Sequence, residues 1–288
     1  MVTYSHFLGS DNLQFGFKRG NSCSHALFTF SESVRYFNKY GSKVYCAFLD
    51  VSKAFDKVLI NGLIKKLIDR NVPYELVSIL FTWFSSLSCC VSWNFLVSPP
   101  FPILCGVRQG GILSPFSFAI YLDDLIANLR KCGYGLYMNS LFAGCVLYAD
   151  DIVLMSGSCH GLQKLVNVCT EYGLEWDLKF NPSKSQVAVF GGPAPSSCQI
   201  FLSTTEISWC NRVKYLGCYF NCRTADVDVS PCLSKFYGSL NSILSVLGSK
   251  HNEMLSVFIV RQYSLPSVMY GSEIWYINDN NLRSLDIA

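Results

Sequence analysis

Hydrophobic and polar positions follow two spacings along this chain. In several stretches an apolar residue recurs every three to four positions, which predicts amphipathic helices. Shorter unbroken apolar runs lie between them and predict buried strands. The expected helices cover residues 26–37, 63–68, 76–87, 118–129, 162–174, 230–247 and 252–263, and the expected strands cover 44–49, 145–148, 152–155 and 185–190, with a small hairpin over 207–220.

Two of these runs flank a pair of carboxylates. Cys145–Tyr148 and Ile152–Met155 predict a β-hairpin, and Asp150 and Asp151 then fall at its tight turn. Adjacent carboxylates beside an apolar hairpin repel each other unless a cation lies between them. A divalent-metal site is therefore one interpretation, and a solvated Asp-Asp turn is the other.

A third carboxylate follows the strand predicted over Val44–Leu49. Asp50 comes directly after that run, at the end of a strand where ligands collect in sheet proteins. The order of elements predicts that this strand and the hairpin lie side by side in an antiparallel sheet backed by helices. Phosphoryl transfer uses two divalent ions about 3.5–4 Å apart. We therefore expect the carboxylate oxygens of Asp50, Asp150 and Asp151 to share one cation-sized gap.

The pattern Tyr-X-Asp-Asp occurs twice, at Tyr121–Asp124 and at Tyr148–Asp151. The first copy lies within a predicted helix, where successive side chains diverge by about 100°. Asp123 and Asp124 then cannot both face one site as residues of a turn can. We expect them to be ordinary helix carboxylates.

Composition limits the class of protein more than its function. The chain has 288 residues, of which 50% are apolar and 15% charged, so it is globular, with room for one large or two small domains. A net charge of +3 is compatible with nucleic-acid binding but does not indicate it. The 14 cysteines form no Cys-X-X-Cys pair, and we expect reduced thiols in a nuclear or cytoplasmic protein.

One uncharged stretch raises the possibility of a membrane protein. No charged residue lies between Glu75 and Arg108, and residues 76–97 are long enough to span a bilayer. Serines, an asparagine and two tryptophans interrupt this stretch, however. We expect a buried helix, with Ile79 and Trp83 on its apolar face, followed by a hairpin, and no membrane span. A hairpin this apolar would favour self-association if it were exposed.

Basic residues and glycines outside the hairpin carry weaker signals. The residues of Gly106–Pro115 form a Gly-rich loop, which lets the backbone approach a ligand closely but is common. The last predicted helix should stop before Pro266. Four basic residues are expected on a solvated helix face: Lys57, Lys65, Lys66 and Arg70.

Five ordered blocks resemble those of a reverse transcriptase: AFLDVSKAFDKV, GVRQGGILSP, LYADDIVLMS, NPSKS and VKYLG. The flanking QFGFKRGNS and LPSVMYGSEIW are similar to the non-LTR (LINE-type) retrotransposon branch. The resemblance implies an α+β fold: a right-hand polymerase palm, made of an antiparallel sheet backed by helices, with incomplete fingers and a partial helical thumb. The polar stretch over residues 223–229 is the candidate domain boundary. It separates a palm with partial fingers, residues 1–222, from a thumb-like helical segment, residues 223–288.

The resemblance also implies an RNA-directed DNA polymerase that transfers dNTPs onto a primer 3′-hydroxyl by two-metal chemistry. The implied partners are an RNA template, a DNA primer and dNTPs, and the implied cofactor is two Mg²⁺ ions, with Mn²⁺ as an alternative. Asp50 would be the first metal ligand, together with the backbone carbonyl of Val51. Asp150 would be the second carboxylate ligand, and Asp151 would support the site.

Further roles follow from the same resemblance. Phe55 would be the steric gate that clashes with a ribose 2′-hydroxyl, although a core aromatic is equally consistent with its position. Lys184 would protonate the pyrophosphate. Apart from the resemblance, the residue is interpreted as an ordinary surface lysine. The loop residues Arg108, Gln109 and Gly110 would contact the nucleotide and template. Tyr215, Leu216 and Gly217 would form the primer grip. Apart from the resemblance, these last three residues are consistent with any β-turn.

The chain also departs from the family pattern. The family's fingers block, which begins with RPI and carries basic residues that grip the triphosphate, is not found before QFGF, where a polar leader stands. Loss of those contacts would weaken binding of nucleotide and template. We expect a fragment of a longer open reading frame, without an endonuclease, or a decayed copy. The alternatives are an inactive remnant that at most binds nucleic acid and a membrane-associated protein; the sequence does not predict the oligomeric state.

Overall fold

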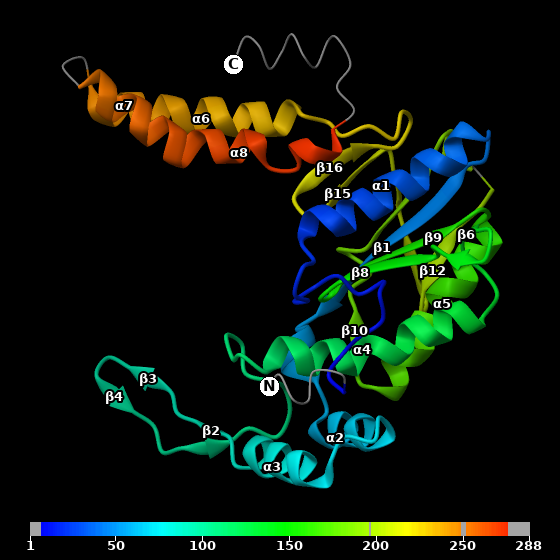
Figure 1. Ribbon diagram of the computed structural model, residues 1–288, viewed down its shortest axis with the longest axis vertical. Helices are drawn as coiled ribbons and strands as arrows, with labels where there is room; N and C mark the ends of the chain where they lie inside the picture. Colours follow the sequence, from blue (N-terminus) through cyan, green and yellow to red (C-terminus); the bar gives the residue numbers. More distant parts are fainter. Residues whose placement is uncertain (1–6, 196, 249–251, 276–288) are drawn as a thin grey trace.

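A central sheet organises the computed structural model, which describes residues 7–195, 197–248 and 252–275 (Figure 1). Its strand order is β14-β11-β1-β9-β8, and β10 also pairs with β1. Each pairing is antiparallel except that of β11 with β14, which confirms the expected antiparallel sheet. The strands are β1 (Val44–Ser52), β8 (Cys145–Tyr148), β9 (Asp151–Ser156), β10 (Lys179–Phe180), β11 (Gln186–Phe190) and β14 (Trp209–Cys210).

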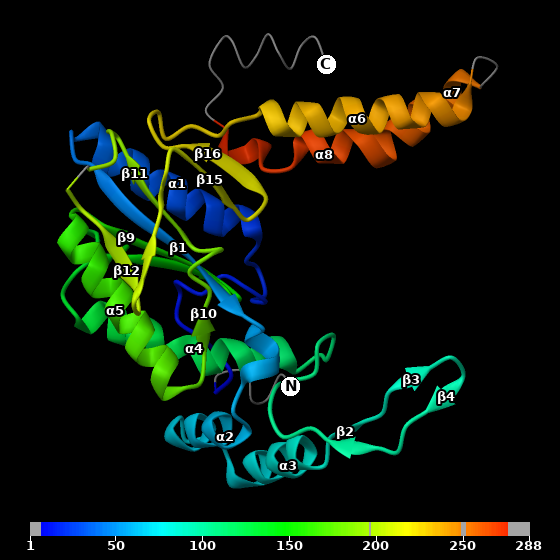
Figure 2. The same ribbon diagram turned by 180° about the vertical axis from the view of Figure 1, so that it is seen from behind.

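The two faces of this sheet support two hydrophobic cores. Side chains of a strand alternate between faces, so Leu49 and Cys46 of β1 belong to different cores. The Leu49 face packs against α4 and α5, and the Cys46 face packs against α1 and the hairpin of β15 (Arg212–Tyr215) and β16 (Cys218–Asn221) (Figures 1 and 2). Leu174, expected inside, is 81% exposed near the end of α5. The three helices are α1 (Cys23–Lys39), α4 (Ser114–Lys131) and α5 (Cys159–Glu175).

Helix α1 begins at Cys23, three residues before the predicted range, because Ser22 caps it. The Ser22 hydroxyl accepts a hydrogen bond from the His25 amide, and the His25 ring accepts one from the Ser22 amide, which caps the helix start. Phe30, on the buried face, meets four aromatic rings at 5.1–5.6 Å between centroids. This cluster fixes α1 against the sheet.

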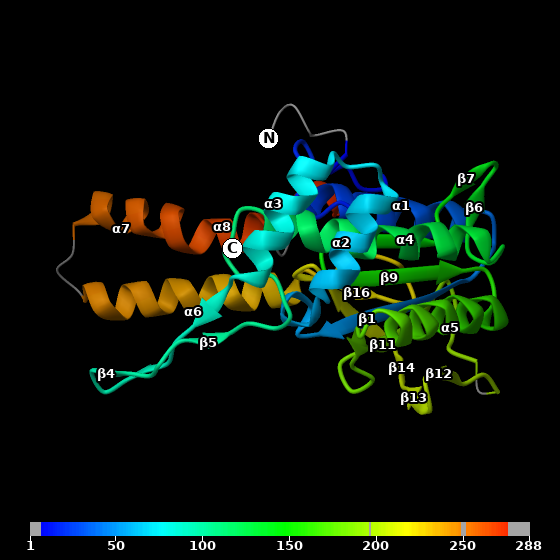
Figure 3. The same ribbon diagram turned by 90° about the horizontal axis from the view of Figure 1, so that it is seen from below.

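Two helices and a projecting arm follow β1. The helix α3 (Tyr74–Ser85) packs against α2 (Ile60–Asp69) but buries only part of its apolar surface, and Ile79, expected inside, is 63% exposed. The arm formed by residues 88–102 extends away from the body, and its tip residue Phe95 is fully exposed (Figure 3). Its strands are β2 (Ser88–Cys89), β3 (Ser92–Trp93), β4 (Leu96–Val97) and β5 (Phe101–Pro102).

The expectation of a buried helix followed by a hairpin is therefore only partly met: the hairpin forms, whereas α3 leaves Ile79 exposed and the arm strands are exposed as well. Among the described residues, no helix is both long and apolar enough to cross a membrane.

Lys66 is buried, and the expectation of a solvated lysine is wrong. Its side chain is only 2% exposed. The ammonium lies 2.6 Å from a carboxylate oxygen of Asp124, 2.8 Å from the Tyr172 hydroxyl and 3.8 Å above the ring of Trp176. Burial lowers the pKa of Lys66. A carboxylate, a hydroxyl and an aromatic face replace the water that this charge loses.

The C-terminal part is a helical pair that projects beside the sheet (Figure 1). The second helix was expected to stop before Pro266, but it continues to Met269, so that expectation is wrong. A π-helical turn precedes the proline, and its wider hydrogen-bond spacing accommodates the missing amide of Pro266. The boundary after residue 222 remains a prediction. The elements are α6 (Ser230–Leu247), α7 (Glu253–Ile259), the π-helix η3 (Val260–Ser264), α8 (Leu265–Met269) and the 3₁₀-helix η4 (Ser272–Ile274).

One disulfide corrects the expectation that all cysteines are reduced. Cys159, at the start of α5, is bonded to Cys198, with 6.7 Å between their Cα atoms. The bond joins residues 39 apart, a pairing that only the tertiary fold creates. The other twelve cysteines are free.

The remaining strands form small pairs: β6 (Tyr137–Met138) with β7 (Leu141–Phe142), and β12 (Ile200–Leu202) with β13 (Thr205–Ile207).

Candidate active site

The register of the sheet brings two of the expected carboxylates together. Asp50 of β1 is the direct partner of Asp151 of β9, so both belong to the same face. Tyr148 pairs with Asp151, which leaves Ala149 and Asp150 as a two-residue turn between β8 and β9. Asp151 is thus the first residue of a strand, and only Asp150 lies in the turn where both had been expected.

Negative charge accumulates at this end of the sheet. Burial, followed by the charges of Asp150 and Asp50, raises the pKa of Asp151 to about 6. Burial, with a contribution from Asp50, also raises the pKa of Asp150. Within the described residues neither carboxylate has a salt-bridge partner. A cation at this position would relieve the repulsion.

The turn that follows β10 surrounds Asp50. The Asp50 amide donates a hydrogen bond to the Ser185 hydroxyl at 3.2 Å, and the Asp50 carbonyl accepts one from the Asn181 amide at 2.8 Å. The ammonium of Lys184 lies 4.0 Å from the Asp50 carboxylate and is 68% exposed. The structure places Lys184 beside the Asp50 carboxylate, and its role toward pyrophosphate remains a prediction.

The three carboxylates do not form a closed ligand set. In the parts of the chain that the structure describes, no group of three or more His, Cys, Asp or Glu side chains could hold a metal ion as it stands. The expectation of one gap shared by all three is therefore not met. Asp50 and Asp151 are partners in the ladder of β1 and β9, whereas Asp150 lies outside it in the turn.

The chemistry of the donors still fits Mg²⁺ in part. Carboxylate oxygens are the hard ligands that this ion prefers, and in phosphate-transfer sites one or two of them suffice, since water and substrate phosphates complete the shell. Asp50 and Asp150 supply two such groups, and Val51, which is next along β1, pairs with Phe180 of β10. The assignment of individual ligands remains a prediction.

Phe55 lies at the start of the helical region beyond β1. It belongs to the 3₁₀-helix η2 (Ala54–Lys57), and its ring stacks on Phe118 of α4 with 4.9 Å between centroids. On another side it meets the edge of Phe17 at 6.4 Å. The residue is partly buried, so it acts as a packing aromatic and still has a surface available to a ligand.

The Gly-rich loop is tied to η2. The Gln109 side chain donates to the Asp56 carboxylate at 3.1 Å, and the Val107 amide donates to the Phe55 carbonyl at 2.7 Å. Gly106 has φ +93°, and a Cβ there would lie 2.8 Å from the Asp56 carbonyl oxygen, so only glycine fits. Three exposed loop residues, Arg108, Gln109 and Gly110, follow, and the first two line a cavity of about 460 Å³.

The expected primer-grip residues form a real hairpin close to the carboxylates. Leu216 and Gly217 make its turn, both with positive φ (43° and 82°), between β15 (Arg212–Tyr215) and β16 (Cys218–Asn221). Tyr215 is only 4% exposed and serves the core. A cavity of about 160 Å³ is shared by the hairpin and the site, and its lining includes Asp50, Asp151, Lys184, Lys214, Tyr215 and Leu216.

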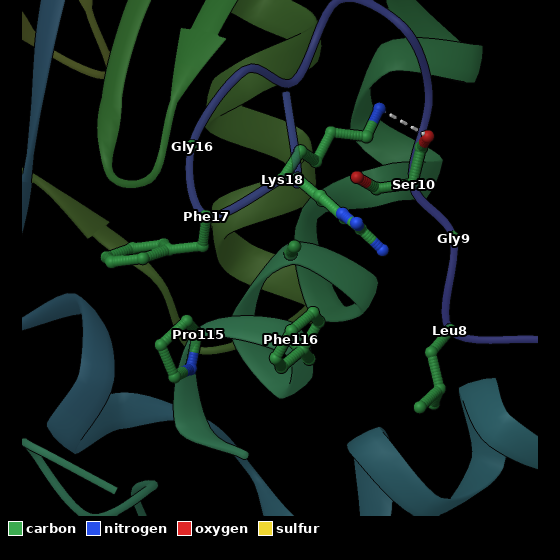
Figure 4. A pocket seen from close by; sticks show the side chains of 10 residues that line it. Leu8, Gly9, Ser10, Gly16, Phe17, Lys18, Pro115 and Phe116 are labelled. Atoms are coloured by element: carbon green, nitrogen blue, oxygen red, sulfur yellow. Dashed lines mark hydrogen bonds between the residues drawn. The ribbon is translucent and has the colours of Figure 1, made fainter. Parts of the chain in front are cut away.

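The N-terminal segment is the part that the sequence analysis missed. The residues before QFGF were expected to be a polar leader, yet Leu8 lies with Phe17 and with Phe116 of α4 in the lining of a cavity of about 360 Å³ (Figure 4). The Lys18 ammonium donates to the Ser10 carbonyl at 2.8 Å (Figure 4). The only signal was the similarity of QFGFKRGNS to the family, which gives no role for these residues.

These features define a class of protein: a nucleic-acid polymerase palm, with carboxylates on adjacent antiparallel strands and helices behind the sheet. Solved structures share this fold. A telomerase from Candida tropicalis in complex with a fragment of telomeric RNA superimposes with a TM-score of 0.59 at 13% identity, covering 99% of this chain and 48% of the telomerase. At this identity the likeness shows the fold alone.

Sequence comparison gives the family. The model of the family described as reverse transcriptase (RNA-dependent DNA polymerase) matches residues 8–220, and the chain belongs to that family. Two curated relatives from Drosophila melanogaster, the probable RNA-directed DNA polymerases from transposon X-element and from transposon BS, are each 26% identical over 273 and 280 residues. The matches cover 91% and 92% of this chain but 29% and 30% of the relatives, so the chain spans less than a third of their length.

Proposed function

We propose that this chain catalyses RNA-templated DNA synthesis, in which a primer 3′-hydroxyl attacks a dNTP and pyrophosphate leaves. The observation that carries the proposal is the register pair Asp50–Asp151 with Asp150 in the adjoining turn. Burial, together with the charges of Asp150 and Asp50, raises the pKa of Asp151 to about 6. Such a site attracts divalent cations, and nucleotidyl transfer uses two of them.

Mg²⁺ would supply neutralisation of phosphate charge and a lower pKa for the attacking hydroxyl. Asp50 and Asp150 would hold it, with the Val51 carbonyl as a further ligand, and Asp151 would add negative charge beside them. Lys184, at 4.0 Å from Asp50, is in position to give a proton to the departing pyrophosphate. Its exposure leaves room for the ammonium to move toward a substrate.

The surrounding elements fit the substrates of this reaction. The Phe55 ring, held by Phe118, would exclude a ribose 2′-hydroxyl and select dNTPs. Arg108, Gln109 and Gly110 would contact the incoming nucleotide and the RNA template. The hairpin with Tyr215, Leu216 and Gly217 would hold the DNA primer. We place this activity in the nucleus or cytoplasm, as part of retrotransposition.

Primer extension on an RNA template tests the proposal. Wild type, Asp150→Asn and Asp69→Asn are compared with Mg²⁺ and dNTPs; Asp69 is an exposed carboxylate at the end of α2 and serves as the matched control. We expect Asp150→Asn to lose activity by about 10²–10³-fold and Asp69→Asn to match wild type. Equal extension by all three proteins would reject the proposal.

One observation favours a second candidate, an inactive remnant that binds nucleic acid only. The described residues contain no preformed group of three ligands for a metal. This candidate predicts retention of an RNA–DNA duplex on the protein with no extension, and a binding affinity that Asp150→Asn does not lower. Extension above the Asp150→Asn background excludes it.

A further inference from the structure

The turn that carries Asp150 has a backbone conformation that needs support. Ala149 has φ +55°, in the left-handed region that a residue with a Cβ adopts at a cost. Its amide and its carbonyl belong to a two-residue turn, outside the ladder of β8 and β9. Another group must therefore satisfy both polar atoms of this buried residue.

Gln14 supplies both partners. Its side-chain oxygen accepts a hydrogen bond from the Ala149 amide at 3.0 Å, and its side-chain nitrogen donates to the Ala149 carbonyl at 3.3 Å. The same oxygen accepts from the Gly16 amide at 2.9 Å. Gln14 is only 1% exposed, so no solvent competes for these bonds. A side chain 135 residues away in sequence thus replaces the missing ladder bonds of the turn.

The backbone around Gln14 fixes the position of its amide. The Leu147 amide donates to the Leu13 carbonyl and the Phe15 amide donates to the Leu147 carbonyl, each at 2.8 Å, so residues 13–15 run beside β8 as a parallel bridge. A Cβ on Gly16 would collide with the backbone nitrogen of Ala149. The segment therefore fits against the turn only with glycine at this position.

We propose that Gln14 is a positioning residue that holds the Ala149–Asp150 turn, and through it the carboxylates of Asp150 and Asp151, in the geometry that the site uses. The importance of the turn for catalysis rests on the proposed polymerase function. The existence of the clamp does not, so the two can be tested separately.

Amide hydrogen exchange tests the clamp without an activity assay. Gln14→Met keeps the length of the side chain and removes its hydrogen bonds. We expect the Ala149 amide to exchange at least about tenfold faster, while the Leu147 amide, bonded to a backbone carbonyl, stays protected. Unchanged protection of Ala149 in Gln14→Met would overturn the inference.

The chain offers a matched control. Gln163 makes the same two bonds to the backbone of Phe201, at 2.8 Å each, on the small β12–β13 hairpin. Gln163→Met removes an equivalent pair of bonds and should leave exchange at Ala149 and primer extension unchanged. If both variants raised Ala149 exchange equally, the effect would be general loosening and the inference would fail.

Kinetics then test positioning. We expect Gln14→Met to lower kcat by about 10- to 100-fold with the KM for dNTP nearly unchanged, because misplaced carboxylates affect the reaction more than binding. Gly16→Ala, which displaces the turn from the other side, should reproduce this change if Gln14→Met folds poorly. Full kcat in both variants would overturn the positioning role. A wild type that does not extend primers would reject the proposed function, and the exchange result would still decide the clamp.

Discussion

The chain contains Tyr-X-Asp-Asp twice, and the two copies differ in structure and in charge. In α4, Asp123 lies 2.5 Å from Arg70 and Asp124 lies 2.6 Å from Lys66. At the hairpin, Asp150 and Asp151 have no ion pair among the described residues, and the pKa of each is raised. The same four-residue pattern is neutralised in a helix and left with unbalanced charge in a hairpin.

The contrast teaches that the surroundings of a motif, more than its letters, decide its chemistry. In the helix each aspartate has its own cation and contributes to folding. In the hairpin neither carboxylate forms an ion pair with any described residue, although Lys184 and Lys214 line the same cavity as Asp151. The comparison can be tested by removing charges from each copy in turn.

The largest expected effect is on catalysis. Asp150→Asn should lower kcat for primer extension by about 10²–10³-fold, whereas Asp123→Asn should keep kcat within about twofold and lower stability instead. Single-turnover extension and thermal unfolding of both variants measure this. If Asp123→Asn were as inactive as Asp150→Asn, the distinction between the copies would collapse.

The next effect is on folding. Asp124→Asn removes the counter-charge of buried Lys66 and should cost about 1–3 kcal/mol of unfolding free energy in urea. Adding Lys66→Met should recover most of that loss, because the buried charge is then gone. No recovery in the double variant would show that the pair itself contributes little.

Metal binding should also distinguish the two Tyr-X-Asp-Asp copies, through a smaller effect on stability. Mg²⁺ at ten times its Kd should stabilise wild type by about 1.4 kcal/mol. The increase in Tm should disappear in Asp150→Asn and persist in Asp124→Asn, measured relative to each metal-free protein. A shift that survives in Asp150→Asn would place the ion elsewhere.

The smallest effect concerns pH without metal. The folded chain holds the Asp151 proton more tightly than the unfolded chain, because the pKa rises from 3.8 to about 6 on folding. Unfolding therefore releases a proton between these values, and stability from this group falls as pH rises from about 4 to 6. Asp151→Asn should be more stable than wild type at pH 7, and the difference should vanish near pH 4. The Asp151 side chain is exposed to solvent, which screens the effect and keeps it small.

The sequence predicts those parts of the fold that depend on local pattern. Apolar runs located β1, β8 and β9, and helical spacing separated Asp123 from Asp150. Long-range pairing lies outside such a pattern. Lys66 is buried because Asp124, Tyr172 and Trp176 come from two other helical regions.

The same limit applies to the candidate site. Asp50 and the hairpin carboxylates were predicted from their strands, and Lys184 from the family blocks. Gln14 lies in a segment without periodicity, and its partner Ala149 is distant in sequence. The π-helical turn before Pro266 was likewise missed, because a proline ordinarily ends a helix and here the chain continues through it to Met269.

Residues 13–15 also cover one edge of the central sheet. The strand β8 is last in the strand order, and the hydrogen bonds between Leu147 and this segment occupy its outward-facing polar groups. An uncovered edge strand offers unpaired backbone groups with which strands of other polypeptides can pair. A shortened version of the protein that starts at α1 would therefore expose β8, and we expect it to precipitate or form oligomers even though its palm helices are intact.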